Sequence, residues 1–251
     1  MNEFFYNFKI ILYVVIILMH SKVMSADQQM GSFQISATLK DLLEGKSLET
    51  YTHFFNHDEL LSWEVYISSN YDVNNPPGLM VYISPTNSGE IPENWKSLML
   101  KYNLIWVSAH HSGNSVESRK RLILAVLASS VINKKYPISL KRVYVSGLSG
   151  GGRMASIAAS QFPELFKGAI YNSGVNFWNN ISKQTLEKIK QNRFVFITGR
   201  NDFNLEDTKR VFRKYKKAGI KNIKLLINPT MGHFNPDKKD FETAINYLDN
   251  K

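Results

Sequence analysis

The sequence predicts an α/β fold with a mostly parallel sheet and helices on both of its faces. Short apolar runs typical of buried strands alternate with longer amphipathic segments along most of the chain. The 251 residues, 43% of them hydrophobic, are enough to bury one sizeable core. No repeat or low-complexity linker divides them. We therefore expect one domain at 61–251, preceded by a less regular N-terminal extension at 26–60.

Residues 1–25 have the pattern of a secretory signal peptide. The apolar run Ile10–Met19 is short for a membrane span but suits the core of a signal. Val23 and Ser25 supply the small residues that a signal peptidase needs, so we expect cleavage before Ala26. The prediction is a secreted or periplasmic protein with no stable membrane insertion after cleavage. The alternative is a protein anchored by an uncleaved N-terminal segment.

Strand-like runs recur throughout the remaining chain. They are 62–68, 79–84, 104–109, 142–146, 168–173, 193–199 and 223–228. The turn sequence Asn74–Gly78 separates the first two runs, which predicts that they enter the sheet as an antiparallel hairpin.

Helical patterns fill most of the intervals between these strands. They are 91–103, 118–136, 153–162, 182–191, 205–218 and 238–250. Much of the formal charge of +10 lies in the stretch Lys209–Lys224, where apolar residues recur at helical spacing between the basic ones. Because no base-reading motif accompanies these charges, we interpret them as a solvated helix face and predict no nucleic-acid partner.

The chain contains no cysteine. This excludes thiol catalysis, thiolate zinc sites, iron–sulfur clusters and disulfides. His110 and His111 end a strand-like run and are candidates for lining a pocket or binding a metal, but no carboxylate lies at ligand spacing near them. We predict neither a metal nor a cofactor.

Residues 143–154, VYVSGLSGGGRM, allow two chemistries. A phosphate-binding loop needs a lysine after its last glycine and then a hydroxyl residue for magnesium. Those positions hold Arg153 and Met154, and methionine cannot bind magnesium. The other interpretation is a G-x-S-x-G nucleophile turn with Ser149 between a strand and a helix. The N–H of Gly150, at the start of that helix, would then face a developing oxyanion.

A serine nucleophile needs a histidine base that a carboxylate orients. With a strand–serine–helix turn, the acid and then the histidine follow in loops after later strands. Asp202 comes just after one predicted strand and His233 just after the next. Glu206 and Asp207 are alternative acids, but Asn204 followed by Asp207 has the spacing of a helix cap, which favours Asp202.

These motifs resemble the α/β-hydrolase superfamily. The likeness lies in 143–174, LIWVSAHHSGN (104–114), ITGRNDFN and MGHFNP, and extends by eye over about 62–251. The sequence is similar in particular to an exported esterase branch of this superfamily, which is related to polyhydroxybutyrate depolymerases and feruloyl or acetylxylan esterases. The resemblance implies an α/β-hydrolase fold with Ser149 as nucleophile, Asp202 as orienting acid and His233 as general base.

One loop departs from the family pattern. Many such esterases carry His-Gly after the strand that supplies the second oxyanion N–H, whereas this chain has ISPTNSG. Pro85 has no N–H, so Thr86 is the predicted donor. The segment often enlarged into a lid runs only from about Val175 to Asn192, which predicts a minimal lid. Phe177 and Trp178 are then expected near the rim of the site, or alternatively in the core, and His110 remains a candidate substrate contact.

The resulting hypothesis is an exported serine esterase that forms an acyl-enzyme on Ser149 and acts on a small-molecule or polymeric ester. A catalytically silent α/β-hydrolase domain that binds a ligand or partner is the alternative. The acyl and alcohol groups depend on loops brought together by folding, and no oligomeric state is predicted.

Overall fold

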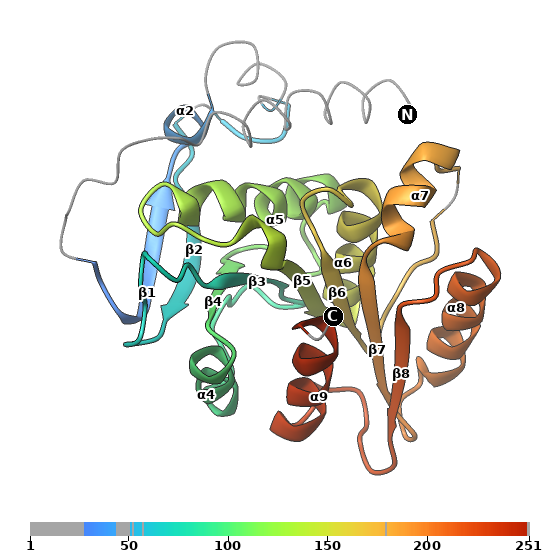
Figure 1. The fold of residues 1–251 in the computed structure, drawn as a ribbon. Helices are drawn as coiled ribbons and strands as arrows, with labels where there is room; N and C mark the ends of the chain where they lie inside the picture. The colour runs from blue at the N-terminus through green and yellow to red at the C-terminus, as the bar shows by residue number, and fades with distance from the viewer. Residues whose placement is uncertain (1–27, 44–50, 52, 57, 179, 250–251) are drawn as a thin grey trace.

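The strands of the structure, a computed structural model, form one eight-stranded sheet (Figure 1). The residues described are 28–43, 51, 53–56, 58–178 and 180–249. The strands are β1 (Gly31–Ala37), β2 (Leu61–Ile67), β3 (Gly78–Ile83), β4 (Leu104–Ala109), β5 (Val143–Leu148), β6 (Gly168–Asn172), β7 (Arg193–Gly199) and β8 (Ile223–Asn228). Their spatial order is β1-β2-β4-β3-β5-β6-β7-β8. The predicted signal segment at 1–25 lies outside the described residues.

All strands from β4 to β8 in this order are parallel, and β2 is antiparallel to both β1 and β4. The predicted mostly parallel sheet is therefore confirmed. The predicted hairpin of 62–68 with 79–84 is wrong, because β4 lies between β2 and β3. After β3 the chain crosses over through helix α4 (Glu93–Lys101) and returns as β4, parallel to β3. β4 therefore occupies the edge of β3 where a hairpin partner would have to pair.

The segment expected as an N-terminal extension contributes to the sheet. β1 pairs with β2 over its full length, from Gly31 opposite Ile67 to Ala37 opposite Leu61. The short helix α2 (Leu39–Leu42) follows, capped by the Thr38 side chain, and buries two leucines in the core. The described part of 26–60 thus belongs to the same domain as the parallel strands.

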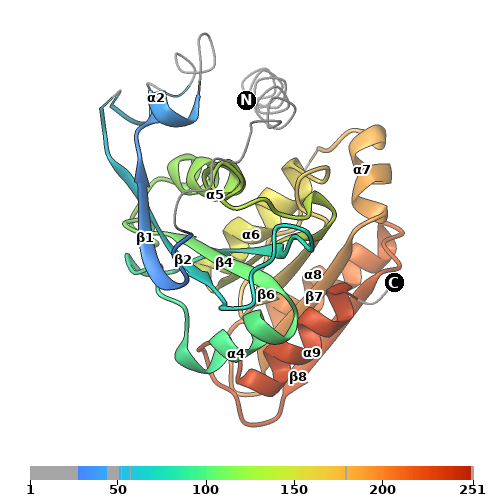
Figure 2. The same ribbon diagram turned by 60° about the vertical axis from the view of Figure 1, so that its left-hand side comes forward.

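The other helices are α4 (Glu93–Lys101), α5 (Ser118–Asn133), α6 (Gly150–Gln161), α7 (Lys183–Lys190), α8 (Leu205–Lys217) and α9 (Lys238–Asp249), with a short 3₁₀ turn at Leu140–Arg142. Helices α5, α6 and α8 pack on one face of the sheet and α4 and α9 on the other (Figures 1 and 2). Each predicted helix is confirmed within a few residues. Helix α6 begins at Gly150, three residues before the predicted start at 153. The predicted start was late because the three glycines at 150–152 have a low helix propensity and hide the helical pattern.

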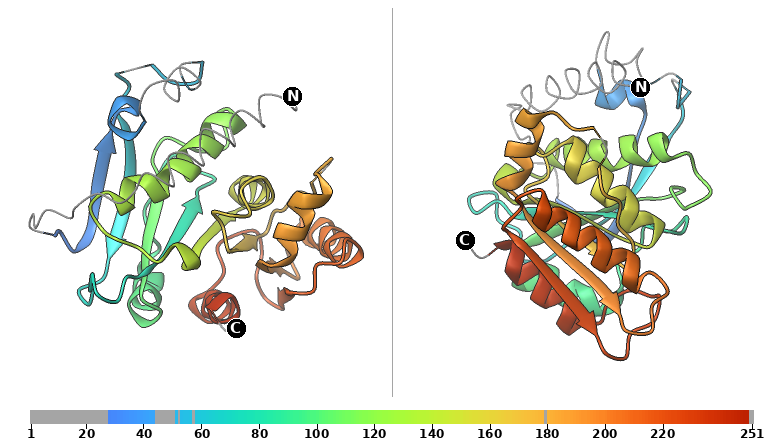
Figure 3. Two further views of the ribbon diagram at one scale, coloured as in Figure 1. Left: turned by 45° about the horizontal axis from the view of Figure 1, so that its top comes forward. Right: turned by 90° about the vertical axis from the view of Figure 1, so that its right-hand side faces the viewer.

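Alternate residues of one strand serve the two layers. In β5, Val143 and Val145 belong to the core cluster under α5 and α6, whereas Tyr144 belongs to the cluster under α4 and α9. This alternation, with both faces buried, is the reason why three successive residues of the strand are large and apolar. In the views of Figure 3 the helices again lie on opposite sides of the sheet, so its carboxyl edge is left to the loops. Among the described residues, no helix is long and apolar enough to cross a membrane.

Candidate active site

Ser149 lies in a strained turn between β5 and α6. Its backbone has φ 56° and ψ −118°, a conformation that non-glycine residues rarely adopt. Its N–H donates to the carbonyl of Asn172, at the end of the neighbouring strand β6, at 2.8 Å. Strain of this kind costs about 1–3 kcal/mol and persists only where the surroundings enforce it. The predicted strand–serine–helix turn is therefore present at the carboxyl edge of the sheet.

Two glycines allow this turn to close. A Cβ on Gly151 would collide with the backbone carbonyl of Ile83 at the end of β3. A Cβ on Gly147 would lie 2.7 Å from the same carbonyl oxygen. Only glycine lets the first turn of α6 approach β3 and β5 this closely. The glycines of the motif are thus explained by packing around Ser149.

Asp202 and His233 meet at the same edge of the sheet. Asp202 follows β7 and His233 follows β8, and His233 Nδ1 lies 3.0 Å from Asp202 Oδ1. The Asp202 side chain is fully buried, while that of His233 is 22% exposed. Because β5 to β8 are parallel, their carboxyl ends place Ser149, Asp202 and His233 on one edge.

Neighbouring groups fix both members of this pair. Asp202 Oδ1 also accepts the Asn204 N–H at 2.8 Å, and Oδ2 accepts the Thr198 hydroxyl at 3.3 Å. The ring of Phe203 lies 4.0 Å from the imidazole ring, centroid to centroid. The Tyr82 hydroxyl donates to Asn235 Oδ1 at 2.7 Å, two residues after the histidine. Burial raises the pKa of Tyr82, so this hydroxyl stays protonated and can donate.

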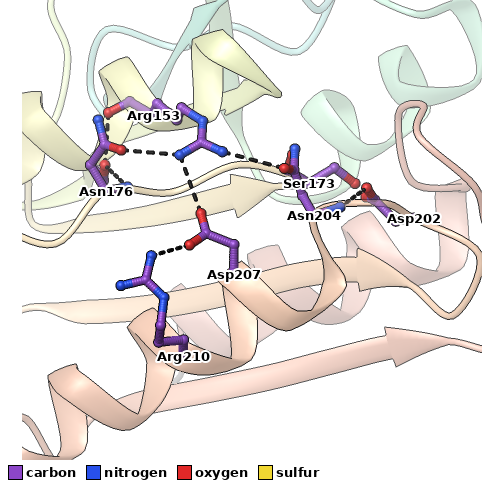
Figure 4. A network of polar contacts seen from close by, with 8 residues as sticks. Arg153, Ser173, Asn176, Asp202, Asn204, Asp207 and Arg210 are labelled. Atoms are coloured by element: carbon purple, nitrogen blue, oxygen red, sulfur yellow. Dashed lines mark hydrogen bonds and ion pairs between the residues drawn. The ribbon is translucent and has the colours of Figure 1, made fainter.

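The alternative acids have other partners. Asp207 Oδ2 lies 3.2 Å from Arg153 Nη1, and its Oδ1 pairs with Arg210 (Figure 4). Glu206 is exposed and pairs with Lys209, a hydrogen bond that lowers the pKa of the glutamate. In the described structure, Asp202 is the carboxylate that contacts the His233 ring.

The prediction that the Asn204 side chain caps helix α8 is wrong. Asn204 does precede α8, but its side chain makes no cap hydrogen bond. Instead its Nδ2 donates to the Ser173 carbonyl at 2.8 Å, and its Oδ1 accepts from Arg153 Nη2 at 3.3 Å (Figure 4). The Asn204 side chain does not cap the helix because both of its polar atoms bind elsewhere: the oxygen accepts from Arg153 and the nitrogen donates to the Ser173 carbonyl.

Arg153 therefore connects helix α6 to the loop that carries Asp202. Its N–H donates to the Ser149 carbonyl at 3.0 Å, one helical turn back, and its guanidinium reaches Asn204, Asp207 and Asn176 (Figure 4). Sequence reasoning considered this residue only as a phosphate ligand. The sequence shows that Arg153 lies one helical turn after Ser149, but it does not show which side chains the guanidinium contacts.

The predicted oxyanion donors differ in availability. Gly150 is the first residue of α6, where backbone N–H groups have no partner within the helix. The Thr86 N–H, in contrast, donates to Ser84 Oγ at 3.1 Å within its own loop. In this conformation the Thr86 amide is already engaged.

Two side chains that sequence reasoning missed hold the loops on this side. Asn114, in the loop after β4, places its side-chain amide against Gly150. Arg121 on α5 is buried and donates to the carbonyls of Ser84 at 2.9 Å and Ser112 at 2.8 Å. Burial lowers the pKa of this guanidinium, which carbonyl oxygens rather than a carboxylate satisfy. A long apolar helix pattern gave no reason to expect a buried arginine there.

His110 has structural partners at both ring nitrogens. Its Nδ1 accepts the Gly89 N–H at 3.2 Å, and its Nε2 lies 3.5 Å from Glu64 Oε2 and 3.1 Å from Gln34 Nε2. Both ring nitrogens are therefore occupied by contacts within the β1–β2–β4 side of the sheet. No cluster of three potential metal ligands occurs among the described residues.

Phe177 and Trp178 combine the two roles considered for them. Their rings stack at 4.4 Å, and Trp178 contacts the buried Tyr215 edge-on at 4.5 Å. Both are only partly buried, and both line a cavity of about 460 Å³ between α6 and α8. They pack on the core with one side and bound a cavity with the other.

Comparisons with known proteins point to hydrolases. Residues 124–191 match the prolyl oligopeptidase family, a stretch that contains Ser149 and ends before Asp202. Acetylxylan esterase A of Aspergillus awamori is 26% identical over 156 residues, which are 55% of this chain and 51% of that protein. The chain thus spans about half the length of this relative.

Solved structures match more of the chain. A ferulic acid esterase has a TM-score of 0.59 over 88% of this chain and 98% of its own, at 13% identity. The chain has the α/β-hydrolase fold. Fluorophosphonate-binding serine hydrolase F of Staphylococcus aureus matches with a TM-score of 0.59 over 88% of this chain and 100% of its own, at 13% identity. Enzymes with this fold carry a nucleophile, an acid and a histidine in that chain order. The predicted residues Ser149, Asp202 and His233 occur in the same order along this sequence.

Proposed function

We propose that the protein is an exported serine hydrolase that cleaves carboxylic esters through an acyl-enzyme on Ser149. The observation that carries the proposal is the 3.0 Å contact of His233 Nδ1 with the buried Asp202, at the sheet edge where Ser149 lies in its strained turn. A buried carboxylate on Nδ1 selects the tautomer whose Nε2 can accept a proton.

The reaction follows from these roles. Ser149 Oγ attacks the ester carbonyl carbon while its proton passes to His233 Nε2, and the carbonyl π electrons move onto oxygen. The tetrahedral intermediate collapses, and the leaving alkoxide takes the proton from His233. Water then attacks the acyl-enzyme with His233 as base, which releases the acid and restores Ser149. Asp202 stabilises the transient imidazolium without taking its proton.

Two kinds of relative support the reaction class. One relative is an acetylxylan esterase and one structural neighbour is a ferulic acid esterase, so esters are the proposed substrates. Another neighbour is a serine hydrolase that binds fluorophosphonates. Export is proposed from the signal-like pattern at 1–25 alone.

Fluorophosphonate labelling of the protein beginning at Ala26 tests the proposal. We expect covalent labelling of the wild type, its loss in Ser149→Ala, and unchanged labelling in Ser115→Ala, which alters an exposed serine outside the site. Turnover of chromogenic esters of graded acyl length, with aryl and sugar esters included, should be lost in the same variant. A folded wild type that is not labelled would instead support the catalytically silent domain. Cleavage of a peptide amide in preference to every ester would move the assignment to peptidases.

A further inference from the structure

The cavity of about 460 Å³ adjoins the nucleophile helix and contains an excess of positive charge. Its charged lining residues are three cations and one carboxylate: Arg153, Arg210, Lys214 and Asp207. Both oxygens of Asp207 are taken, one by each guanidinium group. One carboxylate cannot neutralise three cations, so the cavity attracts a further anion.

An aromatic wall faces these cations. Phe177 and Trp178 stack with an interplanar angle of 26°, and Lys214 Nζ lies 5.3 Å from the Phe177 ring centroid. Arg210 and its partner Asp207 lie on the α8 side of the same cavity (Figure 4). A flat ring surface next to unneutralised cations suits a ligand that carries both a ring and a negative charge.

The cavity is connected to the proposed catalytic residues. Arg153 donates its N–H to the Ser149 carbonyl and its side chain to Asn204, and the Asn204 N–H binds Asp202. One helical turn therefore separates the cavity lining from the nucleophile.

Resting on the function proposed above, we propose that the cavity is a substrate subsite for a ring-bearing carboxylate, which Arg210 and Lys214 bind while Trp178 contacts the ring. The carboxylate can belong to an acidic sugar or to an aromatic acid. Arg153 keeps its structural partners and lines the end of the subsite nearest Ser149.

Direct binding tests this subsite without relying on turnover. Calorimetric titrations of the Ser149→Ala variant would compare a carboxylate with its neutral analogue in two pairs. One pair is methyl glucuronoside and methyl glucoside, and the other is benzoate and benzamide. We expect a carboxylate to bind about tenfold more tightly than its neutral partner, the effect of one charge-assisted hydrogen bond, and to bind less tightly as salt is added. The pair with the larger difference identifies the sugar or the aromatic source.

Matched variants locate the binding. Arg210→Gln and Lys214→Gln should each reduce the preference for the carboxylate severalfold, whereas Arg213→Gln, an exposed cation of the same helix outside the cavity, should not. Equal affinity for both members of each pair, or an equal loss in Arg213→Gln, would overturn the subsite. If carboxylates bind but wild-type protein is not labelled by fluorophosphonate, the proposed reaction fails and the binding site stands.

A second inference concerns the oxyanion hole and rests on different contacts. A Cβ on Gly150 would collide with Asn114 Oδ1 and would lie 2.7 Å from Asn114 Cγ and 3.0 Å from its Nδ2, so both the oxygen and the N–H₂ group of this side-chain amide lie against the residue that follows Ser149. The loop that carries it is fixed, because the Asn114 N–H donates to the Pro85 carbonyl at 2.9 Å. Arg121 binds the flanking carbonyls from below.

The geometry points to Asn114 as a catalytic residue whose side-chain N–H supplies the second oxyanion donor. This role also rests on the proposed reaction. It compensates for the Thr86 N–H, which Ser84 Oγ occupies. An amide donor at this position stabilises the oxyanion more than the planar carbonyl oxygen of the substrate, so its effect falls on kcat.

Asn114→Ala should lower kcat about 100-fold with little change in KM. Asn114→Asp should fall at least as far, because a carboxylate would repel the oxyanion. Ser115→Ala is the control for the loop, and thermal unfolding would confirm that each variant is folded. A folded Asn114→Ala with kcat within threefold of an active wild type would overturn this role. An inactive wild type would instead count against the proposed reaction.

Discussion

The two sides of Ser149 are built differently. On the proposed acid–base side, Asp202 and His233 follow consecutive parallel strands, and hydrogen bonds from Thr198 and Asn204 hold the carboxylate that contacts the imidazole. On the oxyanion side, the contacts come from two loops, those after β3 and β4, which Arg121 joins from beneath. The first arrangement follows from strand order. The second depends on loop conformation, so the two sides should respond differently to substitution.

The largest expected effect lies on the acid–base side. Asp202→Asn should lower kcat for ester hydrolysis about 10⁴-fold, because an amide stabilises the wrong tautomer of His233. Asp207→Asn is the matched control, since it removes an equal charge from the neighbouring Arg153 and Arg210 cluster. Its kcat should stay within tenfold of wild type. Full turnover in Asp202→Asn with loss in Asp207→Asn would reverse the assignment of the acid.

This difference between the two sides also decided what the sequence could predict. Ser149, Asp202 and His233 could be predicted to lie together because each is in the loop or turn after a strand-like run, and parallel strands bring such positions to one edge. The sheet and its helices were predicted for the same reason, namely that burial on both faces leaves long apolar runs.

Other features depended on contacts that no local pattern records. The position of β4 between β2 and β3 follows from the crossover and not from the turn at Asn74–Gly78. Asn204 has the sequence of a helix cap but binds Arg153 and Ser173. Asn114 and Gly150 are 36 positions apart, and only folding of the two loops brings them into contact.

The next effect distinguishes two adjacent glycines. Gly151→Ala should lower the free energy of unfolding by about 3 kcal/mol, because the new Cβ meets the Ile83 carbonyl of β3 and the backbone must shift. Gly150→Ala meets only the movable Asn114 side chain, so its unfolding free energy should change little while kcat falls about tenfold. Urea unfolding and ester kinetics on both variants provide the measurements. Equal loss of stability in the two variants would contradict this separation.

A smaller effect is expected at the arginine beneath the oxyanion loops. Arg121→Gln should lower the free energy of unfolding by about 2 kcal/mol, because the shorter side chain leaves the Ser84 or Ser112 carbonyl unsatisfied. Arg119→Gln, at an exposed position of the same helix, is the control and should change it by less than about 0.5 kcal/mol. Chemical denaturation measures both. An Arg121→Gln protein as stable as the control would show that the loops hold their positions without this side chain.

The smallest effect should come from the bridge between the nucleophile helix and the acid loop. Asn204→Ala removes the side-chain bonds to Ser173 and Arg153 but keeps the backbone N–H that binds Asp202. The loss of two such bonds, partly replaced by water, should lower kcat about fivefold and leave KM unchanged. Asn204→Asp keeps an acceptor for Arg153 and loses only the donor to Ser173, so its kcat should lie between those of wild type and Asn204→Ala. A rise in KM with constant kcat would mean that the bridge shapes substrate binding and does not position Asp202.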